Sequence, residues 1–360
     1  MGVENAEAER SEATPSEVKQ MLGEVMLFEP LMIQNYLHDE FDRDYAPVAA
    51  IQHGAPIEFN ISGATQFYCD LNNLLLRVRA RLTDAANHAP DANYHTGVVN
   101  HPFNSMWRDQ TLTLNGRCIN EPNNMYPWKS YLMNLLNYSR EVQDTRLKCE
   151  CWDRDTAGHF NARAHDGLIV GYNTRAARFA DGQVVEIVVR PFINLFQQEK
   201  LLPPGVNIAY RLTQAADGFV IKSLDGDNTQ YTMQIERVEL IMHTNQLTEA
   251  TELAHREIVQ KQNIRLPFTK VQLKHLSVAQ EIKSVAFDNV FTGVQLSDLV
   301  IMKMITDDEF ASGLHVASPF NFQHFNVSRV KMNKNGTTYP RGGYTPNWAD
   351  GHYINDYMKF

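Results

Sequence analysis

The 360-residue sequence contains no run of about 18 consecutive apolar residues, so we expect no membrane-spanning helix and no membrane insertion. Its first residues, MGVENAEAERSEATPSE, have neither the basic start nor the apolar core of a secretory signal. Only four cysteines occur, and Cys149 and Cys151 form a C-x-C pair that lacks the spacing of a zinc site. We therefore expect reduced, buried thiols in a protein that folds inside a cell.

Positive charge is also scarce. The 33 lysines and arginines are outnumbered by 42 aspartates and glutamates, which gives a formal net charge of −9. A nucleic-acid-binding face needs cationic side chains that neutralise phosphates, so we expect no specific nucleic-acid binding. The chain also lacks the G-x-S-x-G, Walker, H-E-x-x-H and C-x-x-C motifs of common enzyme sites. We assign no catalytic or cofactor-binding residue, and we expect a protein that is not an enzyme.

One stretch, CWDRDTAGHF over 151–160, contains side chains that could ligate a divalent cation. They are Asp153, Asp155 and His159, and carboxylates and imidazoles are common metal ligands. The alternative is a polar loop in which aspartate and threonine side chains support turns. We favour the polar loop, and we therefore predict neither a metal site nor a cofactor.

A motif with three parts stands between 101 and 138. Pro102-Phe103-Asn104 introduces a strand, QTLTL, and Asn115-Gly116 then suit a tight hairpin turn because both accept positive φ angles. An aromatic helix follows from about Pro127, since proline fits a first helical turn. The apolar residues expected on one face of this helix are Trp128, Tyr131, Leu132 and Leu135.

The same parts recur in the same order near the C-terminal end of the sequence. Pro319-Phe320-Asn321 leads into FQHFNVSRVKM, Asn335-Gly336 forms the turn, and an aromatic stretch, NWADGHYINDYMKF, follows. A repeat of this length predicts two similar domains, each built around its own hydrophobic core.

Alternating apolar residues predict strands over 74–82, 185–190, 206–213 and 233–242. In the first of these, three arginines occupy the face that we expect to be solvated. In the last, the apolar residues change parity near Glu236-Arg237, which predicts a β-bulge. About eight strand-like segments precede Asn245, a number that suits a jelly roll.

The predicted fold is all-β, a double jelly roll of two tandem antiparallel β-sandwiches with short helices in its loops. Residues 1–25 are expected to form a flexible acidic arm. The first jelly roll occupies 26–245, with a loop at 84–100 and a loop-rich excursion at 139–183. A connector helix capped by Thr248 spans 246–262. The second jelly roll covers 263–360, with strands over 263–276, 297–305 and 322–332, and lacks its closing strands.

Several stretches, taken together and in order, resemble one protein family. They are APIEFNISG (55–63), DLNNLLLRVRARL (70–82), NNMYPWKSYLMNLLNY (123–138), DTAGHF (155–160), NLFQQEKLLPPGVNIAYRL (194–212) and SPFNFQHFNVSRVKM (318–332). The family is that of the hexon-like double jelly-roll major capsid proteins of Polinton or Maverick elements, adintoviruses and related eukaryotic DNA viruses.

The resemblance implies a homotrimer with a pseudo-hexagonal outline, a hexon-like capsomer that tiles an icosahedral capsid. Its partners would be neighbouring capsomers and a vertex capsid protein. It would belong to the virion, and it would be made and assembled inside the host cell, in the cytoplasm or the nucleus. The family brings no catalytic residues. This sequence departs from the family at Tyr353, after which family members continue with strands that close the second roll.

Other functions remain open at this point. One is a minor or vertex (penton) capsid protein with a single jelly roll. Another is a jelly-roll carbohydrate-binding module, which would have a shallow groove with exposed aromatic side chains and a calcium site. A cupin-type enzyme would need a histidine and carboxylate cluster inside the roll. The aromatic helix over 126–138 could bind a partner or pack on its own domain.

Overall fold

The computed structural model describes residues 36–64, 66–90, 96–120, 122–162, 169–223, 230–288, 290, 299–311, 317–334 and 336–354. The arm predicted over 1–25 lies outside these residues.

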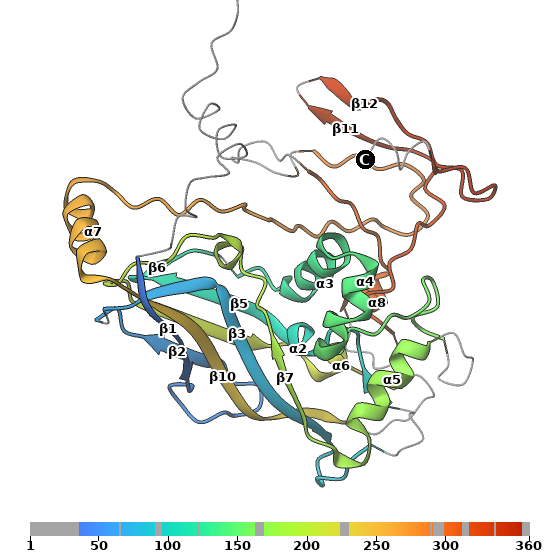
Figure 1. Cartoon of the computed structure of the whole chain (residues 1–360). Helices are drawn as coiled ribbons and strands as arrows, with labels where there is room; N and C mark the ends of the chain where they lie inside the picture. The colour runs from blue at the N-terminus through green and yellow to red at the C-terminus, as the bar shows by residue number, and fades with distance from the viewer. Residues whose placement is uncertain are drawn as a thin grey trace, which may run out of the picture.

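Two four-stranded antiparallel sheets form the body of the molecule (Figure 1). The first has the order β1–β10–β3–β7, and its strands are β1 (Leu37–Tyr45), β10 (Thr232–Leu247), β3 (Tyr68–Thr83) and β7 (Val185–Val189). The second has the order β2–β8–β5–β6, and its strands are β2 (Ile57–Ile61), β8 (Ile208–Gln214), β5 (Trp107–Leu114) and β6 (Arg117–Cys118). A small sheet pairs β4 (Thr96–Val98) with β9 (Ile221–Ser223).

The eight strands of the two large sheets form a jelly roll. When the strands of the two large sheets are numbered along the chain, the first sheet contains strands 1, 8, 3 and 6, and the second contains strands 2, 7, 4 and 5. Successive strands therefore alternate between the two sheets at most steps, as in the two interleaved Greek keys of a jelly roll. The predicted all-β fold class is confirmed, and the strands of this roll lie between Leu37 and Leu247.

The core between the sheets follows from the strand pattern. Apolar residues at every second position of β3, from Leu74 to Leu82, are buried, because alternate side chains of a strand point to one face. The bulge predicted near Glu236-Arg237 is confirmed, since the register of β10 against β3 shifts between Ile235 and Arg237. This extra residue restores Val238 and Leu240 to the core face, where both are buried.

The arginines on the outer face of β3 form ion pairs with β10 and are not simply a solvated row of charges. The Arg77 guanidinium lies 3.0 Å from Glu239, and the Arg79 guanidinium lies 3.1 Å from Glu236, both on the neighbouring strand β10. Arg81 lies 3.4 Å from the same Glu236 carboxylate. The arginine row is therefore matched by carboxylates across the strand pair, which is the pairing expected to stabilise adjacent strands.

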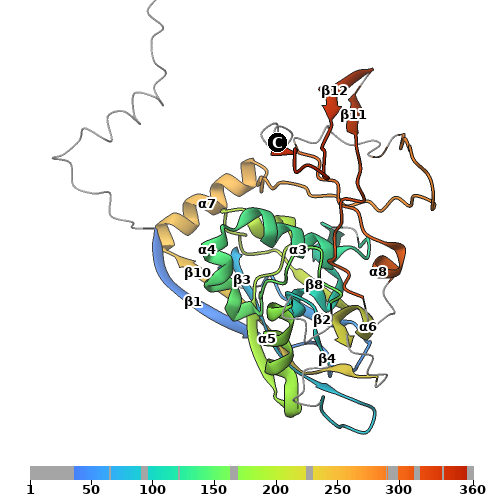
Figure 2. The ribbon, with the colours of Figure 1, turned by 90° about the vertical axis from the view of Figure 1, so that its right-hand side faces the viewer.

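Short helices cover one side of the roll, the right-hand side in Figure 1 and the near side in Figure 2. They are α2 (Pro102–Ser105), α3 (Tyr126–Asn137), α4 (Arg140–Asp144), α5 (Val170–Phe179) and α6 (Asp217–Val220), with 3₁₀ helices η1 (Arg146–Glu150), η3 (Ala180–Gly182) and η4 (Asn194–Gln197). The predicted loop-rich excursion at 139–183 was therefore wrong in its described part, which is largely helical. The loop predicted at 84–100 also contains β4.

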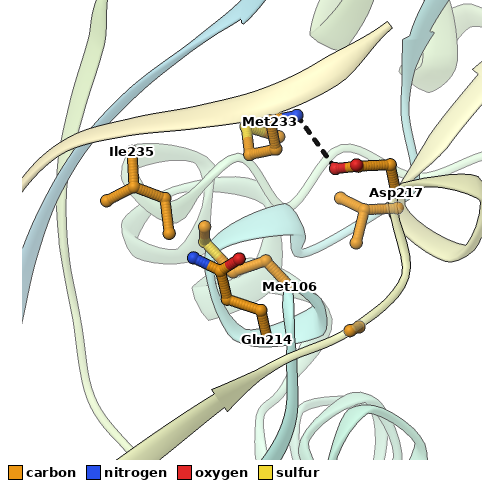
Figure 3. A pocket seen from close by; sticks show the side chains of 7 residues that line it. Met106, Gln214, Asp217, Met233 and Ile235 are labelled. Atoms are coloured by element: carbon orange, nitrogen blue, oxygen red, sulfur yellow. Dashed lines mark hydrogen bonds between the residues drawn. The ribbon is translucent and has the colours of Figure 1, made fainter. Parts of the chain in front are cut away.

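One of the cavities that border the roll interior is very small. It measures about 10 Å³ and lies between Met106 and Gln214 on one side and Asp217, Met233 and Ile235 on the other (Figure 3). The backbone N–H of Met233 donates to Asp217 Oδ1 at 3.0 Å across its edge. This volume has room for about one water molecule, so the cavity is too small for a ligand.

The chain beyond β10 is less compact. Helix α7 (Glu249–Lys261) begins after Thr248, as predicted, although the Thr248 hydroxyl contacts Thr251 Oγ1 rather than capping the backbone. It lies within the range 246–262 of the predicted helix, and its role as a connector between two jelly rolls stays a prediction. With 13 residues it is the longest described helix, so none of the described helices is long enough to cross a bilayer.

After α7, residues 263–288 run as an extended segment toward the C-terminal part of the chain (Figure 1); we call this segment the strap. Short helix α8 (Asp307–Ala311) and the hairpin of β11 (Val330–Lys334) and β12 (Thr337–Tyr344) follow. The strands predicted over 263–276, 297–305 and 322–332 are not formed in the described residues, apart from Val330 to Met332 in β11. An apolar alternation creates a strand only where a neighbouring strand supplies hydrogen bonds, and among the described strands only β12 pairs with any of these segments, at 330–332.

The four cysteines are all free thiols, as predicted. Cys69 and Cys151 are buried, whereas Cys118 and Cys149 are exposed, so the prediction of buried thiols was wrong for two of the four.

Candidate assembly surface

The three candidate metal ligands do not converge. Asp155 forms an ion pair with Arg175 at 2.6 Å, while His159 is exposed. Asp153 is buried 3.7 Å from Arg178, and burial raises the pKa of its carboxyl while the nearby arginines oppose that rise. No group of three or more histidine, cysteine or acidic side chains that could hold a metal is found in the described part of the chain. Asp155 and Asp153 therefore pair with Arg175 and Arg178 of α5, and these ion pairs stabilise the helical side of the roll.

Arg175 is the centre of this arrangement. It is on α5 and only 2% of its side chain is exposed, and its Nε donates to the Val98 carbonyl at 3.0 Å on β4. Its Nη1 donates to the carbonyl of Asp153, and its Nη2 to Asp155 Oδ2 at 2.6 Å. A buried guanidinium has five N–H donors to satisfy, and these contacts tie two segments distant in sequence, β4 and the 153–155 loop, to one side chain of α5.

The aromatic helix α3 packs on its own domain on one side. Tyr126, Ser130, Tyr131 and Asn134 are buried there, whereas Trp128, Leu132 and Leu135 are only partly buried. The Tyr126 hydroxyl donates to Asn104 Oδ1 at 2.7 Å and accepts from a backbone N–H at Phe192. The predicted face was therefore correct for Tyr131. The face that is buried also includes the polar residues Ser130 and Asn134, which the spacing of apolar residues cannot identify.

Helix α3 also binds the C-terminal part of the chain. The Phe320 ring stacks on the Tyr131 ring at 4.2 Å and 6°, and the Phe310 ring stacks on the Trp128 ring at 4.9 Å. The indole N–H of Trp128 donates to the carbonyl of Pro319 at 3.1 Å. Phe320 is 1% exposed and belongs to the same hydrophobic core as the roll. The second PFN motif is thus an anchor on the first domain and not the start of a strand.

Glu309, on α8, closes this contact with hydrogen bonds. Its Oε1 accepts from the amides of Asn161 and Asn321, each at 2.6 Å, and its Oε2 accepts from the Thr306 hydroxyl at 2.7 Å. Asn161 belongs to the first domain, so the buried carboxylate connects the two parts of the chain. We call Glu309, Phe310 and Phe320, together with the side chains that they contact, the clasp.

Lys222 is buried beside the clasp. Its Nζ donates to the carbonyl of Gly218 at 2.8 Å. Burial lowers the pKa of Lys222 to about 7, and the negative charge of Glu309 opposes that change. In the folded protein Lys222 therefore begins to lose its proton near pH 7, because its pKa is about 7.

We expect the unfolding free energy to rise with pH between about 7 and 10 because of Lys222. In that window the unfolded chain keeps the proton on this lysine and the folded chain releases it, and stability rises with pH where the unfolded state binds more protons. Urea unfolding of the native protein and of Lys222→Met would measure the effect. The difference should grow by about 1 kcal/mol per pH unit in favour of the native protein. The exposed Lys261→Met provides the control, and equal slopes for all three proteins would contradict the prediction.

A second feature is the amount of apolar surface that the chain leaves uncovered beyond β10. No residue of α7 is buried in the structure. Exposed apolar side chains continue through the strap and the residues after it, and they include Leu253, Ile258, Val259, Ile264, Phe268, Leu276, Val278, Ile282, Val285, Phe287, Leu299, Val300, Ile301 and Met302. Large exposed apolar areas mark surfaces that other protein surfaces cover. This region is the candidate assembly surface.

No protein-family model matches the sequence. Among curated proteins, the chain is 19% identical over 320 residues to uncharacterized protein F54H12.2 of Caenorhabditis elegans, a match that covers 86% of this chain and 73% of that protein.

Among solved structures, similar chains come from viruses and virophages. The Sputnik virophage structure matches with a TM-score of 0.44 and 9% identity, over 69% of this chain and 53% of that chain. The mavirus major capsid protein matches with a TM-score of 0.34 and 12% identity, over 68% and 53%. The Faustovirus major capsid protein matches with a TM-score of 0.38 and 8% identity, over 69% and 60%. This chain thus spans between 53% and 60% of the length of these solved chains.

Proposed function

We propose that this chain is a structural capsid protein, a hexon-like subunit whose homotrimers tile the icosahedral shell of a DNA virus or a virus-like transposon. The observation that carries the proposal is the order of the two four-stranded sheets, which is that of a jelly roll. A fold alone serves many functions, so the proposal also needs a site-level argument.

The interior of the roll supports a structural role. Its two sheets enclose one continuous cluster of buried apolar side chains. Of two cavities beside the roll, one has room for about one water molecule, and the other, of about 370 Å³, is an open hollow whose lining includes Asn60, Ser62, Thr113 and Asn207. A lectin groove would display exposed aromatic rings, but the rings of α3 are covered by the chain's own clasp. These features favour a building block over a ligand-binding module or an enzyme.

The candidate assembly surface supports association. A monomeric protein rarely leaves a long series of apolar side chains in water, because each buried methylene stabilises by about 0.8 kcal/mol. The partners that we propose are two further copies of this chain, neighbouring capsomers and a vertex capsid protein. The proposed location is the virion, after synthesis and assembly inside the host cell.

The mass of the purified protein and its negative-stain images test the proposal. We expect a particle of three chains, about 123 kDa from a chain mass of 41.1 kDa, with a hexagonal outline. A compact monomer that binds glycans, or one that carries a stoichiometric metal, would overturn the proposal.

A second candidate is a vertex capsid protein with a single jelly roll. The observation that favours it is the strand count after α7, where the described residues contribute β11 and β12 alone. The same images separate the two candidates, because a vertex protein would form particles with fivefold symmetry and a hexon-like protein would form particles with a hexagonal outline.

A further inference from the structure

Helix α7 lacks the packed face that a helix of its length needs. None of its 13 residues is buried, and helices of about this length are only marginally stable in water by themselves. One contact with the roll joins His255 Nδ1 to the Tyr68 hydroxyl at 3.1 Å. The side chains of Leu253, Ile258 and Val259 are 61%, 52% and 48% exposed. They therefore form an uncovered apolar surface on a helix at the margin of the molecule (Figures 1 and 2).

The residues that precede β1 include an apolar segment of suitable length. Residues 25–33, VMLFEPLMI, lie outside the described part of the chain, and seven of these nine are valine, methionine, leucine, phenylalanine or isoleucine. An apolar run of this kind is stabilised when another protein surface removes it from water. Nine extended residues span about 30 Å, whereas a helix of 13 residues rises about 20 Å. The segment is therefore long enough to follow the whole of α7.

The segment ends where α7 begins. The backbone N–H of Thr248, which precedes the helix, donates to the carbonyl of Tyr36 at 2.9 Å. Leu37 is paired with Leu247 where β1 lies beside β10. Only residues 34 and 35 separate the segment from Tyr36. A covalent link this short gives a local concentration on the order of millimolar, which favours α7 of the same copy over α7 of a second copy.

We propose that residues 25–33 pack along α7 of their own copy and cover the apolar side chains of Leu253 and Ile258. The strap does not cover this helix, because it runs away from α7 toward the C-terminal part of the chain (Figure 1). The contact does not depend on the proposed function. It leaves the strap and the residues after it as the part of the candidate assembly surface that other copies would cover.

Substitutions in the segment test the inference from one side. Leu27→Gln/Phe28→Gln, in the full chain, removes two apolar side chains from the segment. We expect the amide hydrogens of α7 to exchange at least about tenfold faster than in the native protein, because the helix loses its cover. Mass spectrometry of peptides that span 249–261 measures this exchange. The matched control, Val3→Gln/Ala13→Gln, changes two apolar residues outside the segment and should leave the exchange of α7 unchanged.

Substitutions in the helix test it from the other side. Leu253→Gln/Ile258→Gln removes apolar surface from α7 but preserves its helix propensity, because glutamine is a good helix former. Chymotrypsin accepts large apolar side chains in its specificity pocket. It should cleave within 25–33 at least about tenfold faster in this variant than in the native protein, since cleavage follows the population of the released segment. Glu257→Gln/Lys261→Gln alters exposed polar positions of the same helix and should leave the cleavage rate as in the native protein.

Unchanged exchange in the segment variant, or unchanged cleavage in the helix variant, would overturn the inference. Repeating the cleavage over a dilution series, with sedimentation to follow association, identifies the copy that supplies the segment. Protection that persists as oligomers dissociate supports a contact within one copy. Protection that is lost in step with dissociation would overturn it, because a second copy would then supply the segment. A native monomer with a protected segment would count against the capsid proposal and leave this inference standing.

Discussion

Replacing Phe320 by alanine will lower the unfolding free energy by about 3–5 kcal/mol, the cost of removing a fully buried phenylalanine ring. The ring is 1% exposed, stacks on Tyr131 at 4.2 Å and meets Phe219 edge-on at 6.0 Å. Its loss leaves a cavity between α3 and α6 and frees the clasp from the roll. Urea unfolding followed by tryptophan fluorescence will measure the change, because Trp128 is part of the clasp.

Phe325→Ala is the matched control. It removes the same ring from a side chain that is 47% exposed, five residues farther along the chain, and should cost less than about 0.5 kcal/mol. Limited proteolysis adds a second measure, since release of the clasp exposes the chain at 304–311 and 317–322 to cleavage. Equal stabilities of the two variants would show that the clasp does not hold the C-terminal part of the chain to the first domain.

Arg175→Ala should be about as harmful, with a loss of about 3–5 kcal/mol, because it leaves a buried carboxylate without its cation. Asp155 would lose its partner at 2.6 Å, and the carbonyl of Val98 would lose its donor. Since Arg175 joins α5 to β4 and to the 153–155 loop, the damage should spread over the helical side of the roll. Thermal and urea unfolding will give the size of the effect.

The exposed pair of Arg140 and Asp144 supplies the comparison. The Arg140 side chain is 81% exposed, and exposed ion pairs contribute about 0–1 kcal/mol, so Arg140→Ala should change the stability little. Arg175→Lys keeps the charge but loses the planar fork of donors, and an intermediate loss is expected. If Arg175→Ala and Arg140→Ala unfold alike, the network around Asp155 does not support the roll.

Much of the first roll could be predicted, because its strands obey simple alternation. The change of parity near Glu236-Arg237 located a bulge correctly, and Asn115-Gly116 located the β5–β6 turn, where both residues have positive φ. A second register shift on β10, between Ile241 and His243, escaped prediction. No change of parity marks it, since the side chains around it are buried almost without alternation.

The C-terminal part could not be predicted in the same way. Phe103 and Phe320 stand in the same short motif and both are buried, but Phe103 leads into β5 and Phe320 anchors the clasp. The motif specifies a buried aromatic ring, and the surrounding partners decide whether a strand follows. Glu309 and Arg175 were missed for another reason. A buried charge is recognised by the groups around it, and those groups come from distant parts of the chain.

The continuous apolar core between the two sheets of the jelly roll has a mechanical consequence. Proteins lose volume on unfolding mainly by eliminating internal voids, so a unit with a tightly filled interior gives hydrostatic pressure little to act on. Close-packed interiors also have low compressibility and pass a load from one face to the other without yielding. In a shell built from such subunits, an applied load would deform the contacts between subunits before it deformed the subunits themselves.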